Sequence, residues 1–279
     1  PTRCGRSKRV TRHRAGPARR ARRPRERAWG ALPGADVAEN ARVVPSLHHP
    51  SGAPPPLLLK LGRLALEEAG AAYSDVARSG NGTSAMMKMM AVANGMPPFA
   101  PPFLKAGNLV IGHTANILLY LGSRHGLAPK AEAGKLLVHQ LQLTITDFVL
   151  EAHDTHHPLG PSLYYEEQKG PAKKRTEEFW KSRVPKYLEY FEALLKANGG
   201  AYVTGRRLTY VDLSLFQIVE GMRYAFPKRM KAFEREIPRL VELHDRIAAR
   251  PNIKAYLASD RRIAFNEDGI FRRYKVLDG

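Results

Sequence analysis

This sequence has very little cysteine and no long apolar run, and each absence excludes a class of protein. The single cysteine, Cys4, excludes internal disulfides and a metal cage of thiolates, and it requires no oxidising compartment. The longest apolar candidate, around residues 57–59, is far shorter than the roughly 20 residues of a membrane-spanning helix. We therefore expect a soluble, cytoplasmic protein that does not engage a membrane.

Acidic residues are outnumbered by basic ones, and the excess is concentrated at one end of the chain. Residues 1–30 hold 12 Lys or Arg and one acidic residue, so they carry +11 of the net +19, while the other 249 residues carry +8. The whole chain has 279 residues, of which 43% are hydrophobic. That is enough apolar material for a core in one or two domains.

The basic segment is rich in Arg and Pro and has no helical or strand periodicity, so residues 1–50 are predicted to be a disordered arm. Clustered arginines bind phosphates without sequence preference, which makes a nucleic-acid arm one interpretation. An Arg-rich, acid-poor segment also suits an organelle transit peptide, although serine is scarce. A third interpretation is a fragment or a mis-joined gene, since the chain begins at Pro1. We favour the third and do not expect nucleic acid as a partner.

From about residue 54 the pattern becomes that of a folded domain. Apolar residues recur at helical spacing over residues 61–70, and Gly70 ends this predicted helix. A strand is predicted at residues 72–76. Residues 79–98 are rich in Gly and Met and predict an irregular helix with its loop, whose methionines serve as core filler and not as metal ligands.

Residues 99–121, FAPPFLKAGNLVIGHTANILLYL, carry the most information about function. Two short extended runs, 103–105 and 109–111, flank a turn signal at 106–108, so we predict a two-stranded hairpin. The pair at residues 101–102 is Pro-Pro, a candidate cis peptide bond, because only X–Pro bonds adopt cis at low cost.

Thr114 is predicted to begin an amphipathic helix as its N-cap. The N–H groups in the first turn of a helix favour a carboxylate or phosphate, so this helix start is a candidate anion site. By pattern alone, a hairpin that packs on a helix without any ligand fits about equally well.

Beyond residue 129 the sequence predicts only helices. Residues 132–154 and 174–198 carry apolar residues at spacings of three and four, and Pro185 predicts a bend in the second stretch. Thr209 precedes an apolar helix, and Asp212 follows three residues later. This is the spacing of a capping box, in which two side chains satisfy backbone N–H groups at a helix start.

Together these motifs resemble the glutathione S-transferase family over roughly residues 61–279. The resemblance is carried by the EEAG turn at 67–70, by the residue pair that opens the helix after the hairpin, and by YVTGRRLTYVD at 202–212. It implies an α+β domain of thioredoxin-like fold at residues 51–127, whose first strand is degraded or missing, followed by an all-helical domain at 132–279.

The resemblance also implies where glutathione binds. Backbone groups around Pro101, Pro102 and Phe103 would pair with the cysteine of glutathione in the manner of a strand. Thr114 and its helix N-terminus would bind the γ-glutamyl carboxylate. His113 stands where family members commonly carry Gln or Glu, so its contact differs from theirs.

Three further residues take roles from the resemblance. Asp147 would cross a dimer interface to the γ-glutamyl amine, although a solvated helix-surface acid is an equally good interpretation. Thr209 and Asp212 would form the buried capping box of the helical domain and would serve folding, not catalysis.

The catalytic residue cannot be identified. Lowering a thiol pKa of about 8.5 by two units takes about 2.7 kcal/mol, which one hydrogen bond from a Tyr or Ser hydroxyl largely supplies. In the family this hydroxyl lies near the end of the first strand, yet residues 41–60 contain no Tyr and carry three consecutive prolines. Ser46 or Ser51 could serve, but serine is ordinary in loops. Tyr73 is assigned to packing, and Cys4 lies too far upstream.

A histidine-rich segment at residues 153–157 is the best candidate for a metal site. His153, His156 and His157 share a helical face at spacings of three and four, and with Asp154 they could bind zinc. No second group of ligands completes the shell, and a helix end rich in His is ordinary. No metal is therefore expected.

Under the resemblance, this histidine segment borders the pocket for the second substrate. Tyr164 and Tyr165 would be apolar walls of that pocket. Near the C-terminus, Arg272 and Tyr274 would either close the pocket or cap the surface.

The function implied by the resemblance is that of a glutathione transferase. Glutathione is a substrate, no cofactor is needed, and the thiol is conjugated to an electrophilic small molecule, which is the chemistry of detoxification. A homodimer is also implied. Because no activating hydroxyl is identified, the alternative is a non-catalytic binding or scaffold protein of the same fold. A nucleic-acid binder acting through the basic arm is a third, weaker interpretation.

Deleting residues 1–30 is predicted to leave glutathione affinity and melting temperature nearly unchanged. This segment lacks apolar periodicity, so its contacts with the folded body are weak and screened by salt. Calorimetry, a thermal melt and a salt-titrated DNA-binding assay on the full-length and shortened proteins test the prediction. Loss of the fold on deletion would contradict it and would show that the arm supplies part of the core.

Overall fold

The computed structural model describes residues 41–44, 57–78, 82–91 and 96–279. The chain divides into two units, residues 1–35 and 36–279, and every described residue lies in the second. Most of the predicted arm at 1–50 therefore lies outside the described residues, as do Ser46 and Ser51. Among the helices that are described, none combines the length and hydropathy of a membrane span.

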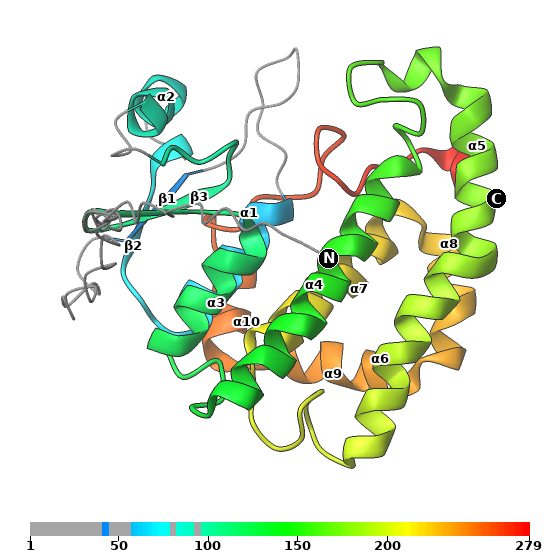
Figure 1. The fold of residues 1–279 in the computed structure, drawn as a ribbon. Coiled ribbons are helices and arrows are strands. Elements are labelled where there is room, and N and C mark those ends of the chain that lie inside the picture. Colours follow the sequence, from blue (N-terminus) through cyan, green and yellow to red (C-terminus); the bar gives the residue numbers. More distant parts are fainter. Residues whose placement is uncertain (1–40, 45–56, 79–81, 92–95) are drawn as a thin grey trace, which may run out of the picture. The chain divides into compact units, whose positions relative to one another are not determined.

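A four-stranded sheet forms the first part of this unit (Figure 1), with strand order β2-β1-β3-β4. Strand β1 runs parallel to β2 and antiparallel to β3, which in turn pairs with β4 in a hairpin. The strands are β1 (Ala41–Val44), β2 (Tyr73–Asp75), β3 (Phe103–Ala106) and β4 (Leu109–Gly112).

Strand β1 corrects the prediction that the first strand is degraded or missing. It lies at Ala41–Val44, inside the stretch assigned to the arm, and it pairs on both sides. The prolines at 54–56 made a strand in this region look unfavourable. They follow β1 in the sequence, so they remove no donor from its hydrogen-bond ladder.

Helices cover both faces of the sheet because side chains alternate along each strand. Leu104 and Ile111 lie in the same core cluster as residues of α1 (Leu57–Glu68) and α3 (Thr114–Arg124). Their neighbours Phe103 and Val110 belong to a second cluster with α2 (Gly82–Ala91). Figure 1 shows α2 on one side of the sheet and α1 and α3 on the other.

The predicted role of the methionines in α2 holds in part. Met86 is buried in the smaller cluster and Met89 and Met90 pack against it, but Met87 is exposed. A ten-residue helix presents only one face to a sheet, so the methionine on its outer face stays in solvent.

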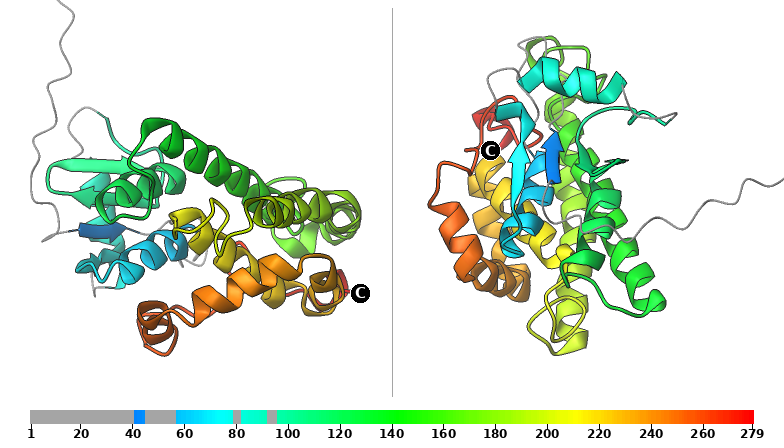
Figure 2. Two further views of the ribbon diagram at one scale, coloured as in Figure 1. Left: turned by 90° about the horizontal axis from the view of Figure 1, so that it is seen from below. Right: turned by 90° about the vertical axis from the view of Figure 1, so that its left-hand side faces the viewer.

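The rest of the unit is helical, as predicted, and two further views show how these helices pack (Figure 2). The helices are α4 (Glu132–Asp154), α5 (Lys169–Glu178), α6 (Val184–Asn198), α7 (Tyr210–Ala225), α8 (Pro227–Phe233), α9 (Pro238–Ala248) and α10 (Pro251–Leu257). Single 3-10 turns lie at η1 (Val76–Arg78), η2 (Tyr165–Glu167), η4 (Glu234–Glu236) and η5 (Lys275–Leu277).

Pro185 distorts the chain between α5 and α6, as its position predicted. Residues Phe179–Arg183 (η3) form a π-helical turn, and the Val184 N–H donates to the Phe179 carbonyl, five residues back. Proline has no N–H and crowds the preceding turn, so the wider turn accommodates it where a regular helix could not.

Helix α7 is the centre of the helical part, with 13 of its 16 residues buried. It contacts α1, α4, α8 and α9. Its first residue also joins the two parts of the unit, because the Tyr210 N–H donates to the Leu127 carbonyl at 3.0 Å. Gly122 in α3 makes room for this contact, since a Cβ there would lie 2.5 Å from the Tyr210 ring.

The capping box predicted at Thr209 and Asp212 is confirmed. The Asp212 carboxylate accepts from the N–H and hydroxyl of Thr209 at 2.7 and 2.9 Å, and from the Val203 N–H at 2.8 Å. The carboxyl group is fully buried. Burial raises its pKa to about 6, against the opposing effect of these donors.

This raised pKa predicts a pH-dependent contribution to stability. Between the unfolded pKa of 3.8 and the folded value of about 6, the native state binds the extra proton, so stability falls as pH rises. Relative to Asp212→Asn, which does not titrate, the wild-type protein should lose about 2.4 kcal/mol of unfolding free energy between pH 4 and pH 7. Urea unfolding of both proteins across this range measures the difference. The raised pKa would be contradicted if the unfolding free energy of the wild type, relative to that of Asp212→Asn, stayed constant or increased from pH 4 to pH 7.

Candidate functional site

The hairpin and the start of α3 form the candidate glutathione site. The strands and turn lie where the sequence predicted them, with Gly107 at a φ of +59° in the turn. The peptide bond between Pro101 and Pro102 is cis, as predicted, and Pro102 is buried immediately before β3.

Strand register brings the two halves of this site together. Phe103 pairs with Gly112 across the hairpin, and this is the last pair at that end. The residues one step further out, Pro102 and His113, therefore lie at the same end of the hairpin, where Thr114 begins α3. Two motifs separated by a turn in the sequence thus meet at one edge of the sheet.

The helix start differs from the prediction in one detail. His113, not Thr114, is the N-cap of α3, and Thr114 is the first helical residue. His113 has a φ of +60°, which residues other than glycine rarely adopt, and its exposed side chain makes no capping bond. The chain must turn sharply from β4 into α3, and this residue takes the unusual conformation.

The N-terminus of α3 has the properties of an anion site. Its hydrogen-bond ladder begins with the Ile117 N–H, which donates to the His113 carbonyl at 2.9 Å. The N–H groups of the turn before Ile117 and the helix dipole therefore present positive charge at this end. Thr114 is buried there, with 6% of its surface exposed.

Asp147 lies on the exposed surface of α4, away from the packed face of that helix. Leu143 and Leu150 lie one turn before and one turn after it, and both are also exposed. Within one chain Asp147 is therefore a surface acid. Its predicted role across a dimer interface remains a prediction.

Tyr73 has a packing role, and no thiol-activating role is indicated for it. Its hydroxyl donates to the Glu67 carboxylate at 2.7 Å, and its ring packs against the main core. Burial, and then the bond to Glu67, raise its pKa above the usual range, which is opposite to what an activating tyrosine needs. The other candidate hydroxyls, Ser46 and Ser51, lie outside the described residues.

One buried cation was missed from the sequence. Lys60, in the first turns of α1, is only 2% exposed, and its Nζ lies 3.7 Å from the centre of the Phe265 ring. Burial, with the nearby charges of Arg262 and Arg63, lowers its pKa to about 7. The available signal was a Lys within an otherwise apolar helical face, which the pattern alone does not distinguish from a surface lysine.

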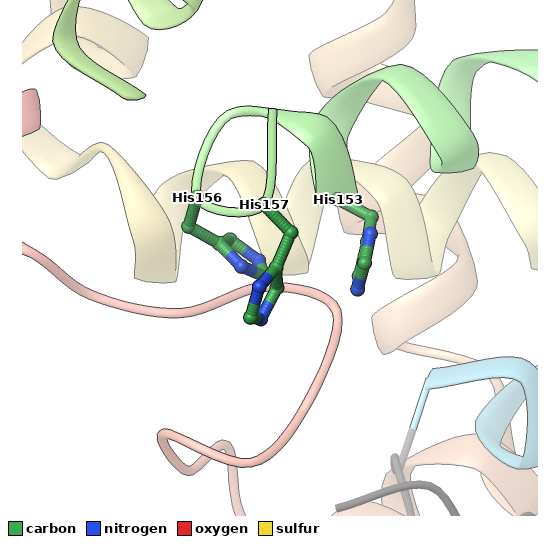
Figure 3. A group of neighbouring side chains, drawn as sticks. All are labelled: His153, His156 and His157. Atoms are coloured by element: carbon green, nitrogen blue, oxygen red, sulfur yellow. The ribbon is translucent and has the colours of Figure 1, made fainter. Parts of the chain in front are cut away.

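The histidine segment forms a compact cluster, although not as part of one helix. Helix α4 ends at Asp154, and His156 and His157 lie on the turn that follows. Figure 3 shows the three side chains extending to the same side of this helix end. One ring nitrogen from each of His153, His156 and His157 lies within 4.8 Å of the others.

Asp154, predicted as a possible fourth ligand, is not a member of this cluster. Its carboxylate lies 3.9 Å from His153 Nδ1 and 3.9 Å from the Arg175 guanidinium. The helix ends at this residue, so the chain turns the later histidines toward His153 and leaves Asp154 at the edge.

The C-terminal segment packs against this histidine cluster. Tyr274 stacks on Tyr165 with ring centres 3.7 Å apart and lies 6.1 Å from the His156 ring. Arg272 is buried and donates to the Gly269 carbonyl at 2.8 Å. Of the two predicted wall residues, Tyr165 is thus buried under the C-terminal segment, while Tyr164 is exposed.

Comparison with known proteins identifies the family to which this arrangement is similar. A family model described as the C-terminal domain of glutathione S-transferase matches residues 153–260. Glutathione S-transferase P 1 of Xenopus laevis is 30% identical over 165 residues, covering 58% of this chain and 69% of that protein. The glutathione S-transferase of Plasmodium yoelii yoelii is 24% identical over 165 residues, with coverage of 59% and 70%.

Solved structures show the same fold. A glutathione S-transferase of Caenorhabditis elegans is 20% identical, with a TM-score of 0.57, and the match covers 81% of this chain and 99% of that one. Prostaglandin synthase D of Nilaparvata lugens is 19% identical, with a TM-score of 0.60 and coverage of 81% and 100%. These likenesses confirm the predicted order of a thioredoxin-like sheet domain followed by helices.

Proposed function

The chain belongs to the glutathione S-transferase family, and from this premise we propose that it binds glutathione and transfers its thiol to electrophilic small molecules. One observation carries the proposal: Pro102, His113 and the start of α3 lie at the same end of the β3–β4 hairpin. A peptide with a free carboxylate could pair with the backbone before β3 and place that carboxylate at the helix N-terminus.

In this proposal the site residues form two groups, which bind different parts of glutathione. The backbone of Pro101, Pro102 and Phe103 holds the cysteine of glutathione in an extended conformation. Thr114 and the first turn of α3 hold the γ-glutamyl carboxylate through a hydroxyl, N–H groups and the helix dipole. His113, exposed at the same edge, offers a polar contact to the peptide backbone of glutathione.

The reaction needs the glutathione thiolate. The thiol loses its proton, the sulfur attacks an electrophilic carbon, and a carbon–sulfur bond replaces the bond to the leaving group. A Ser or Tyr hydroxyl that donates a hydrogen bond to the sulfur favours the thiolate. We assign no residue to this step, since both candidate serines lie outside the described residues.

The alternative function is glutathione binding without catalysis, favoured by the absence of Tyr from residues 41–60. A spectrophotometric assay with glutathione and a chlorodinitrobenzene separates the two. Conjugation above the uncatalysed rate supports the transferase. Binding by calorimetry without conjugation, for several classes of electrophile, would support the non-catalytic alternative.

Thr114→Ala is predicted to weaken glutathione binding about tenfold. The substitution removes one hydrogen bond to a charged carboxylate, which contributes about 1.5–3 kcal/mol. Calorimetric titration measures the change, and circular dichroism checks the fold. Thr114→Ser retains the hydroxyl and is the matched control, with affinity expected within about threefold of the wild type. Wild-type affinity in a folded Thr114→Ala protein would remove Thr114 from the site.

We also propose that the chain forms a homodimer through the outer face of α4. Four leucines of this helix are 47–64% exposed: Leu136, Leu137, Leu143 and Leu150. Leu143, Asp147 and Leu150 follow one another at spacings of four and three, so they form one stripe. An exposed apolar stripe on a long helix is characteristic of a protein interface.

A double substitution tests the dimer. Leu143→Glu with Leu150→Glu places two charges in the stripe and should convert a dimer to a monomer, because an interface core disfavours unpaired charge. Leu159 is as exposed as Leu150 but lies beyond α4, so Leu159→Glu is the control and should stay dimeric. Light scattering coupled to size-exclusion chromatography gives the mass. A monomeric wild-type protein at micromolar concentration would contradict the proposal.

A further inference from the structure

The three clustered histidines have the spacing of ligands around one metal ion. Their ring centres lie 4.8, 4.9 and 5.0 Å apart. Three imidazoles on a tetrahedral ion with Zn–N distances of about 2.0–2.1 Å have ring centres about 5 Å apart. The ring centres therefore already lie at the required separation. The His153 and His157 rings are stacked at 22°, so the His153 ring has to turn before its nitrogen points to a common centre.

A backbone carbonyl fixes which nitrogen of the His156 ring carries the proton, and another carbonyl lies next to the His157 ring. The Ile270 carbonyl lies 2.8 Å from Nε2 of His156, and the Leu163 carbonyl lies 3.0 Å from Nδ1 of His157. A carbonyl only accepts, so Nε2 of His156 is protonated and its lone pair is on Nδ1. Nδ1 of His157 also lies 3.2 Å from the amide nitrogen of Gln168, which is a donor, so these contacts allow either tautomer of His157. Zinc-binding histidines commonly have the arrangement of His156, in which the second ring nitrogen donates to a carbonyl.

The Nδ1 lone pair of His156 has no hydrogen-bond partner in the part of the chain that the structure describes. Only 1% of His156 is exposed, and this nitrogen is buried. A buried polar atom without a partner costs about 1–3 kcal/mol. A metal ion at the centre of the cluster would remove that cost, and this buried nitrogen therefore points to a ligand independently of the ring spacing.

The charge around the cluster bears on metal binding in two ways. Burial, the largest cause, lowers the pKa of His153 to about 4 and that of His156 well below its usual value. Arg272 is a nearby cation that contributes to both shifts and disfavours a dication. Asp154, at 3.9 Å from His153, offsets part of that charge.

We propose that His153, His156 and His157 form a binding site for Zn²⁺, with three imidazole ligands and a fourth position open to water or a small ligand. Zinc suits three nitrogen ligands, and a site with three protein ligands keeps one position exchangeable. His153 is the adaptable member, because it is partly exposed and the other two lie against backbone carbonyls.

The test is a titration of the full chain, freed of metal and of any affinity tag, with ZnCl₂ in the absence of glutathione. One Zn²⁺ per chain is expected to bind, and Zn²⁺ should raise the melting temperature, since the ion binds the folded state. His153→Gln and His156→Gln should each weaken binding at least about tenfold. Co²⁺ bound in place of Zn²⁺ should show the intense visible absorption of tetrahedral coordination.

A matched control separates this site from adventitious histidine binding. The sequence has one other adjacent histidine pair, His48 and His49, and their double substitution to Gln should leave the affinity for Zn²⁺ unchanged. Because His156 is buried, circular dichroism must show that its variant folds, and the partly exposed His153→Gln variant carries the test if it does not. No binding by the wild type, or wild-type affinity in folded His153→Gln protein, would overturn the proposal.

Discussion

The buried carboxylate of Asp212 is the interaction on which the rest of the structure depends. It binds the N–H groups of Val203 and Thr209 and so fixes both the start of α7 and the chain that leads into it. Helix α7 is buried along almost its whole length and contacts helices from both parts of the unit. An error in where this helix begins would rotate its apolar residues away from every neighbour at once.

The same helix start connects the sheet domain to the helical domain. Tyr210 donates its N–H to Leu127 and places its ring against Gly122 of α3. Helix α3 also carries Thr114 at its other end, where the proposed carboxylate site lies. The position of that site relative to the helical domain is therefore set by a glycine and a tyrosine that take no part in binding.

Some buried polar groups are paired and others are not, and two of the unpaired atoms belong to side chains that contact the C-terminal segment. Arg63 pairs with Asp75, and Arg250 pairs with Glu68. Lys60 Nζ and His156 Nδ1, in contrast, are buried without a hydrogen-bond partner among the described residues. Lys60 lies over Phe265, and His156 bonds to Ile270, so both contact the same segment. An unpaired buried polar group costs stability, so each of these two positions is retained against a cost of about 1–3 kcal/mol.

Sequence alone determined the features that depend on neighbouring residues. The hairpin followed from its turn residues, the capping box from the three-residue spacing of Thr209 and Asp212, and the distortion at Pro185 from the missing N–H. Tertiary structure decided the rest. Strand β1 is four residues long and is held by partners at 73–75 and 103–105, so its local sequence carries little signal. Lys60 is buried by Phe265, about 200 residues away in the chain, and the histidine rings meet only because α4 ends between them. These three features depend on contacts between segments that are distant in the sequence, and a local sequence pattern does not specify which distant segment packs against it.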